Sequence, residues 1–456
     1  MRLQINMHKN PDRMRFLCIP AGFLVISCLG LSYAESLYVN PLIDLGASTN
    51  FLAMSNNIYT VLAVVMAIAG GKLLEKYGPS NVNFFGIATL VLGTAITSLV
   101  VSHGVIWYLV GLIITTWGYA VIYIAVYDNI NRWFPDMKGT AMAITGMGIA
   151  VCGTFAAPLA ASWIEHFGFG GQFIVMGIAF GVLGYVGLIF FPNAPEGYTP
   201  KGYKPLLEED ETGNIPDVDP ETGFIQKNWK MLLKDPCAYM LFLLPIVAVL
   251  TGMVISGHAT WMAEDILGLT PTKAAWFISA FMASNTVGKL VFGALGDIIG
   301  RLWNAIIIYA INAGATVLFL LIMTRPGMAS VAAFTIGCIA IGFTFGGSST
   351  LMAAMTSDLF GSKYFGLNFA ILSQAPNFGY MLAPWIAFTA KSGGAAGYGK
   401  CFTLCLIGAC LGLVFAIIMK IVRKDNVQKI RKLTDEEKAA RAAKAEATAA
   451  ENTTEE

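Results

Sequence analysis

Long apolar segments alternate with short polar connections along most of this chain. Each apolar segment exceeds the roughly 20 residues that an α-helix needs to cross the hydrocarbon core of a bilayer. The pattern predicts spans at 16–39, 51–73, 81–102, 105–128, 139–164 and 171–192, and again at 236–261, 273–297, 302–324, 329–354, 364–390 and 399–421. We therefore predict an all-α integral membrane protein with twelve transmembrane helices.

Two polar stretches interrupt this pattern. Residues 193–235 contain several prolines and an acidic cluster, which predict an aqueous linker. The segment after Arg423 is rich in Ala, Glu and Lys and is predicted to be solvated. The predicted organisation is an N-terminal segment 1–15, a six-helix lobe 16–192, the linker 193–235, a second six-helix lobe 236–421 and a charged tail 422–456.

Composition supports a membrane protein and argues against an enzyme. Hydrophobic residues make up 56% of the chain and charged residues only 12%, against about 25% charged in a typical soluble domain. The eight cysteines lack the paired spacing of a metal site and are predicted to be inert, buried thiols. No nucleotide-binding loop is found, and no nucleophile, base and orienting group occur together. We therefore expect no enzymatic activity, cofactor, metal or nucleic-acid partner.

Lysine and arginine fall mainly in alternate connections between the predicted spans. The connections on one side, together with the tail, carry most of them. The opposite connections carry only Lys273, Arg325, Lys391 and Lys400. Because basic residues are enriched in cytoplasmic loops, the pattern predicts a multi-pass protein of the cell membrane with both termini in the cytoplasm.

A short pattern occurs twice along the chain. Residues 71–78, GKLLEKYG, recur 222 positions later in residues 293–301, GALGDIIGR. Phe134 and Pro158 in the first half have the same spacing as Phe360 and Pro384 in the second half. Two related halves of an apolar chain are typical of a secondary transporter that holds its substrate between the repeats.

With these motifs the chain resembles the major facilitator superfamily, whose matching loops carry Gly-x-Leu-x-Asp-x-x-Gly-Arg. The second copy is close to this pattern, whereas the first has Glu75 in place of Asp. The chain also resembles the oxalate/formate antiporter group and related monocarboxylate carriers. The marks of that group here are GLSYA at 30–34, PL at 41–42, RWFPD at 132–136, Gly139, DLFG at 358–361 and GLNF at 366–369. The resemblance covers 16–421 and implies the major facilitator fold, with two six-helix pseudo-repeat lobes and transport by alternating access.

Charged residues at the predicted cytoplasmic helix ends are candidates for gating. Glu75 and Asp297 can pair with basic groups such as Arg301 or cap a neighbouring helix, which would latch one face shut. The alternative is that they are solvated surface charges. Asp128 and Arg132 lie one helical turn apart and are predicted to form a local pair in the same region.

Lys289 is the most informative charge inside the predicted spans. It lies eight residues before Asp297, about 12 Å into its helix, with Asn285 one turn away. The resemblance implies that Lys289 occupies the position of the helix-8 arginine that binds substrate carboxylate in the oxalate/formate group. Lysine offers a point charge rather than a bidentate fork, so a different anion geometry is expected. The alternative is a structural ion pair or a side chain that reaches the interface.

A second cation, which the oxalate/formate group carries in helix 11, is missing from this sequence. Pro376 or a neighbour takes its place. Two cations suit a dicarboxylate and one suits a monocarboxylate, so a monocarboxylate is favoured. Pro376 also predicts a local break in the helix, with Gln374 and Asn377 lining a cavity. A passive kink is the competing interpretation.

Two titratable residues are candidates for proton coupling. Glu35 lies in the outer third of the first span. It either carries a proton, pairs with Lys289 or faces the outer water. His258 lies near the outer end of the seventh span and either gates or binds solute or is a structural histidine.

Tyr33, Tyr119 and Tyr123 would enclose an anion well, although tyrosines in spans also serve as packing or interface anchors. The sequence thus predicts a monomeric secondary transporter that moves a small organic anion by exchange or proton symport. Its expected partners are that anion, protons or a counter-anion, and the lipid bilayer. The alternative is a carrier of a neutral or cationic solute, of the drug or sugar type, with Lys289 in an ion pair.

Overall fold

The computed structural model describes residues 11–195, 198, 200–201, 226–382 and 397–422. Every regular element in these ranges is helical. Eleven of the described helical segments are long and apolar enough to cross a membrane. The predicted all-α membrane fold is therefore confirmed, and the predicted span 364–390 lies partly outside the described residues.

The first lobe begins with an interrupted span. α1 (Pro11–Ser27) continues as the 3₁₀ helix η2 (Cys28–Tyr38) and the short α2 (Val39–Asp44). Gly168, with φ 72°, interrupts α7 and divides it into two spans, a backbone geometry that glycine adopts readily. The remaining elements of this lobe are α3 (Thr49–Tyr77), α4 (Pro79–Thr97), α5 (Val100–His103), α6 (Ile106–Trp133) and α7 (Lys138–Ile189).

The second lobe follows a short connecting helix, α8 (Trp229–Leu232). Helix starts coincide with caps that the sequence supplies. The side chain of Asp235 accepts the backbone N–H of Cys237, and that of Ser330 accepts the N–H of Ala333. The elements are α9 (Pro236–Leu267), α10 (Pro271–Ile299), α11 (Arg301–Thr324), η3 (Pro326–Met328), α12 (Val331–Phe360), α13 (Phe365–Leu372) and a last helix, Gly397–Val422.

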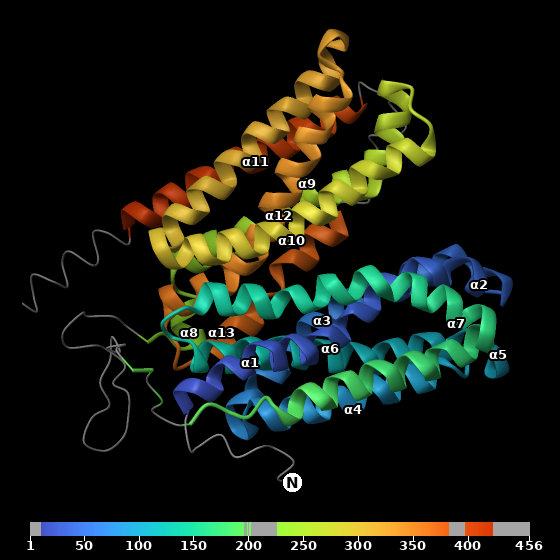
Figure 1. Cartoon of the computed structure of the whole chain (residues 1–456), viewed down its shortest axis with the longest axis vertical. Coiled ribbons are helices and arrows are strands. Elements are labelled where there is room, and N and C mark those ends of the chain that lie inside the picture. Colours follow the sequence, from blue (N-terminus) through green and yellow to red (C-terminus); the bar gives the residue numbers. More distant parts are fainter. Residues whose placement is uncertain (1–10, 196–197, 199, 202–225, 383–396, 423–456) are drawn as a thin grey trace, which may run out of the picture.

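The two lobes meet at one end of the molecule and lie apart at the other (Figure 1). The end where they meet carries α8, α13 and the beginning of α1, and we call it the linker side. α2 and α5 lie at the opposite end of the first lobe. Contact between the lobes is made mainly by α7 with α10 and by α3 with α13. The residues at these two crossings therefore decide whether the linker side is closed.

Candidate functional site

Lys289 lies in the second half of α10, inside a segment suited to span a membrane. Its side chain is half-buried. Among the residues that the structure describes, none forms a hydrogen bond or ion pair with its ammonium group. An unpaired ammonium at membrane depth is unfavourable. An anionic partner, from the protein or from a bound solute, would therefore stabilise the Lys289 ammonium group.

Asn285 precedes Lys289 by one helical turn and is buried where α10 meets α12. Its Oδ1 atom has no hydrogen-bond partner within the described residues. A Cβ atom at Gly346 of α12 would come within 2.0 Å of the Asn285 carbonyl oxygen and 2.8 Å of its Oδ1. The glycine therefore lets the two helices approach closely, and Asn285 keeps an unused acceptor one turn from Lys289.

Gln374 and Asn377 form a polar pair just after α13. The Gln374 amide nitrogen donates to the Ala370 carbonyl at 3.0 Å and to Ser373 Oγ at 3.1 Å, and its Oε1 accepts from Asn377 Nδ2 at 3.0 Å. The helix is interrupted at Ser373 and Gln374 and then resumes. Pro376 accounts for the break, because it cannot donate to the carbonyl four residues earlier. The pair thus lies at a point where backbone carbonyls lack helical partners.

The two predicted tyrosines on α6 contact different lobes. The Tyr119 hydroxyl donates to the Leu29 carbonyl and lies 2.8 Å from Ser32 Oγ, both on η2 of the same lobe. The Tyr123 ring stacks on Phe369 of α13, in the opposite lobe, with ring centroids 5.7 Å apart. Tyr119 therefore braces the first span and Tyr123 belongs to the contact between the lobes. A substrate role for either stays a prediction.

Three further predicted positions lie on described helices. Tyr33 and Glu35 are on η2, and His258 is on α9. Their side chains lie outside the described part of the structure. The predicted cavity role of Tyr33 and the predicted proton coupling through Glu35 or His258 therefore stay predictions.

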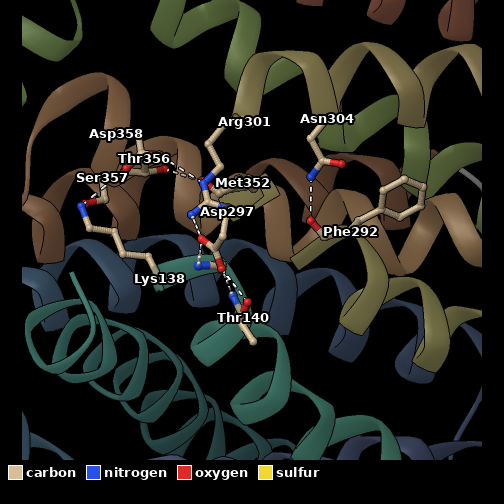
Figure 2. Close-up of polar contacts among 11 residues, drawn as sticks. Lys138, Thr140, Phe292, Asp297, Arg301, Asn304, Met352, Thr356, Ser357 and Asp358 are labelled. Carbon is tan, nitrogen blue, oxygen red and sulfur yellow. Dashed lines mark hydrogen bonds and ion pairs between the residues drawn. The ribbon is translucent and has the colours of Figure 1, made fainter. Parts of the chain in front are cut away.

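Asp297, near the end of α10, joins the two lobes (Figure 2). Its carboxylate accepts the backbone N–H of Gly139 at 3.1 Å, the N–H of Thr140 at 2.7 Å and the Thr140 hydroxyl at 2.6 Å. Both N–H groups belong to the first turn of α7, where a helix leaves N–H groups unpaired and its dipole favours negative charge. Asp297 thus caps a helix of the opposite lobe, which is the geometry of a latch.

Alternating charges extend this latch across the contact between the lobes (Figure 2). Arg301 pairs with Asp297, and its Nε donates to Asp358 Oδ2 at 3.1 Å. Lys138, from the opposite lobe, donates to Ser357 Oγ at 2.8 Å and lies 3.5 Å from Asp358 Oδ1. We call Asp297, Arg301, Asp358 and Lys138, with Thr140 and Ser357, the polar latch.

Sequence reasoning did not assign four members of the polar latch to gating, namely Lys138, Thr140, Ser357 and Asp358. A signal was present for two of them. Lys138 directly precedes Gly139, and Asp358 follows the tenth predicted span, 329–354, by four residues. A charged residue just before or after a predicted span was the available indication for both residues. The hydroxyl groups carried no comparable signal.

The repeated glycines mark the two crossings between the lobes. A Cβ atom at Gly293 would lie 2.5 Å from the Ala143 Cβ on α7. A Cβ atom at Gly71 would lie 3.0 Å from the Ala370 Cβ and 3.0 Å from the Leu367 Cα on α13. Glycine at the same position of the repeated motif therefore lies at both crossings, between α10 and α7 and between α3 and α13. Close approach of helix backbones requires small residues, which explains why both copies carry glycine.

Gly293→Ala should destabilise the closed linker side, because the added methyl group overpacks the crossing with Ala143. Overpacking typically costs about 1–3 kcal/mol, which lowers the ratio of closed to open protein by roughly fivefold to a hundredfold. The measurement is the rate at which a membrane-impermeant maleimide modifies a cysteine placed at Ser357, which is buried at the latch. Gly314→Ala is the matched control, since nothing lies within 4 Å of a Cβ there. Equal rates in both variants would contradict the assignment.

The acidic residues near the first copy of the motif, residues 71–78, make different contacts from those of Asp297 in the second copy. Glu75 is exposed and lies within electrostatic range of Asp128 and Arg132. Asp128 is fully buried and its Oδ2 accepts from Arg132 Nε at 2.8 Å. The Asp128 Oδ1 has no hydrogen-bond partner in the described part, and it lies 3.5 Å from where a Cβ of Gly366 would be, at the start of α13. The Asp128 carboxylate thus lies close to a helix of the opposite lobe, as the Asp297 carboxylate does in the other half.

The sequence also matches two known protein families. Residues 22–263 match the Major Facilitator Superfamily, and residues 208–365 match the MFS/sugar transport protein family. The first match spans more than half of the chain. The chain therefore belongs to the Major Facilitator Superfamily, whose members are membrane transporters.

Individual proteins agree with this assignment. The chain is 27% identical over 432 residues to the oxalate:formate antiporter of Oxalobacter formigenes, which covers 93% of this chain and 96% of that protein. It is similar in structure to the fucose:proton symporter of E. coli, with a TM-score of 0.62, 14% identity and 88% and 98% of the two chains covered. It is also similar to the human organic anion transporter MFSD10 (TETRAN), with a TM-score of 0.64, 12% identity and 89% and 99% of the two chains covered. The two structures confirm the fold, and the predicted resemblance to the oxalate/formate group is confirmed.

Proposed function

We propose that this protein is a secondary transporter that moves a small organic anion, a monocarboxylate, by exchange. The observation that carries the proposal is the half-buried ammonium group of Lys289, which has no partner among the described residues. A carboxylate that enters between the lobes would neutralise it. The similarity to an oxalate:formate antiporter supports an anionic substrate and an exchange mechanism.

A single cation favours one carboxylate rather than two. In this proposal Lys289 provides the charge, and Asn285, Gln374 and Asn377 provide neutral polar groups. The substrate is therefore a compact anion in which the carboxylate is the only charge.

We further propose that the linker side faces the cytoplasm, as the distribution of lysine and arginine predicts. The structure then corresponds to a state closed toward the cytoplasm by the polar latch and the two glycine crossings. Lobes 16–192 and 236–421 rock about the substrate, and the latch opens when the cytoplasmic ends part. In this proposal the transporter works as a monomer.

Exchange follows from the charge of Lys289. A carrier that changes state without substrate would bury an unpaired ammonium between its lobes, at a penalty of several kcal/mol. A bound carboxylate removes most of that penalty, so the loaded carrier moves faster than the empty one. Proton symport through Glu35 or His258 is the competing coupling mode, because a protonatable carboxyl near Lys289 would let the empty carrier return.

A second candidate is a carrier of a neutral solute such as a sugar. The match of residues 208–365 to the MFS/sugar transport protein family favours it. In that case Lys289 would serve as half of an ion pair with Glu35, and neutralising both residues together would restore transport.

Uptake into proteoliposomes distinguishes these candidates. The panel consists of labelled formate, lactate, pyruvate, oxalate and a neutral hexose, each with and without trapped unlabelled solute and with and without a proton gradient. We expect uptake of a monocarboxylate that requires a trapped anion. Uptake driven by the proton gradient alone would establish symport, and uptake of the hexose would establish the second candidate.

A further inference from the structure

A cavity lies in the first lobe, at the end opposite to the linker side. It occupies about 610 Å³ between α2, the connection that contains α5 and the interruption of α7 at Gly168. Figure 1 shows α2 and α5 at this end of the lobe. Cavities of roughly 300–1,000 Å³ hold drug-sized molecules. The cavity is therefore large enough for a small organic ligand, and all its lining residues belong to the first lobe.

Two glycines of α7 shape the cavity in different ways. A Cβ atom at Gly168 would meet nothing within 4 Å, so the chain leaves open space at the interruption. A Cβ atom at Gly170 would lie 2.9 Å from the Ser98 carbonyl oxygen and 3.2 Å from Val101 Cγ2. The wall formed by α7 is thus joined to the α5 connection at Gly170 and stands open beside Gly168.

Apolar side chains make up most of the cavity wall. Phe167 is 57% exposed and Ile174 is 45% exposed. Further apolar side chains in the wall are those of Leu45, Leu99, Val101 and Phe169. Covering apolar surface that faces water is favourable. A ligand with an apolar body would therefore be stabilised against this wall.

The polar side chains of the cavity are hydrogen-bond acceptors. Asp44 is exposed, and no described residue forms an ion pair with it. The Ser98 hydroxyl donates to the Ala95 carbonyl at 2.6 Å, and the Ser102 hydroxyl donates to the Leu99 carbonyl at 3.3 Å. A hydroxyl group has one proton and two lone pairs, so both oxygens can still accept. The lining residues include no lysine, arginine or histidine. The cavity therefore suits a ligand that donates hydrogen bonds.

The chain around the cavity favours a positive charge on that ligand. The stretches 39–50, 98–105 and 161–171 contain Asp44 and Glu165 and no lysine or arginine. Their other ionisable side chains are the histidines at 103 and 166. With histidine counted as neutral, these stretches carry only negative charge. A surface of one sign attracts ions of the opposite sign, and an anion would meet no lysine or arginine there.

We propose that this cavity binds an organic amine with an apolar body. The ammonium group donates to the Asp44 carboxylate and to Ser98 Oγ, and the apolar body covers Phe167 and Ile174. An aromatic ring at the cavity also attracts a cation. The ligand contacts α2 and both parts of α7 without entering the space between the lobes. The site is separate from Lys289, which lies in the second lobe, so the inference goes beyond the proposed function.

Fluorescence titration of the purified protein tests the proposal with three probes that share one ring system. Dansylcadaverine carries a primary amine, dansylamide is neutral and dansylglycine is an acid. We expect saturable binding of dansylcadaverine, and binding of the other two that is weaker by about fivefold or more. Equal affinity for the three probes would overturn the proposal. The titration involves no transport, so its outcome is independent of which solute the protein carries.

Two pairs of variants locate the binding. Ile174→Trp fills the cavity and should remove the saturable binding, whereas Ile178→Trp, at an exposed position one turn further along α7 and outside the lining, should bind as the parent does.

Asp44→Asn should weaken dansylcadaverine binding by about twofold to fivefold and leave dansylamide unaffected. Glu165→Gln is its control, because Glu165 is exposed but does not line the cavity. Unchanged affinity in both Ile174→Trp and Asp44→Asn would overturn the site. Displacement of the probe by dioctanoylphosphatidylethanolamine at lower concentrations than by octylamine would assign the cavity to a lipid headgroup and overturn a site for a free amine.

Discussion

Lys289→Gln is expected to abolish transport of the anion while leaving the protein folded. Truncating one partner of a buried, hydrogen-bonded charge pair costs about 2–5 kcal/mol, which corresponds to at least about thirtyfold in affinity. Because no described residue pairs with Lys289 in this structure, the substitution leaves none of the described carboxylates without its partner. The loss should therefore appear in substrate binding and exchange rather than in thermal stability.

The control for this prediction lies on the same helix. Lys273 is exposed near the beginning of α10, so Lys273→Gln should bind and exchange the anion as the parent does. Lys289→Arg keeps the charge but changes a point donor into a planar fork, and we expect it to retain binding with altered preference among acids. Full exchange by Lys289→Gln would remove the basis of the anion proposal.

Asp297→Asn is expected to open the linker side. The variant keeps the shape of the side chain but loses the charge that caps α7 and pairs with Arg301. Hydrogen bonds to charged groups contribute about 1.5–3 kcal/mol, so the closed state should lose roughly tenfold or more of its population. Spin labels at Lys76 and Lys363, which are exposed on opposite lobes, should report a longer distance.

Asp235→Asn is the matched control for the latch. Asp235 also caps a helix and pairs with a lysine, but its partners Cys237 and Lys227 do not lie in the first lobe. Removing its charge should leave the distance between the lobes unchanged. If both variants lengthen the distance equally, the effect reports general destabilisation, and Asp297 has no special part in closing the linker side.

The sequence predicted the fold well because the bilayer makes hydrophobicity the dominant signal. Apolar length located the spans, and the polar interval 165–170 located the break that the structure places at Gly168. The first span was harder. Residues 28–38 form a 3₁₀ helix rather than an α-helix, and apolar length does not distinguish these two.

The latch could be predicted in part. The repeat identified Asp297 and Arg301 because both copies of a motif occur at helix ends. It also suggested that Glu75 would play the equivalent part, which stays a prediction, and the structure places Asp128 beside Gly366 of the opposing helix. The partners Ser357 and Thr140 depend on which helices cross, and that information lies in the packing of the two lobes rather than in local sequence.

The candidate site residues likewise include some that the sequence identifies and some whose contacts depend on packing. A lone lysine in an apolar span is conspicuous in the sequence, and the structure finds it without a described partner. Tyr123, by contrast, could have faced a cavity or packed on a neighbour, and its contact with Phe369 follows only from the approach of α6 and α13. Ionisable residues are thus predictable at membrane depth because they are costly there, whereas aromatic residues are common and fit many roles.

Equilibrium binding of a labelled monocarboxylate to the purified protein tests the central claim most directly. Competition is measured with the unlabelled acid and with its amide, which has nearly the same shape but no charge. The account predicts that the acid competes and the amide does not, and that Lys289→Gln removes the binding of the labelled acid. Equal competition by the amide, or unchanged binding in Lys289→Gln, would contradict a site in which Lys289 neutralises a carboxylate.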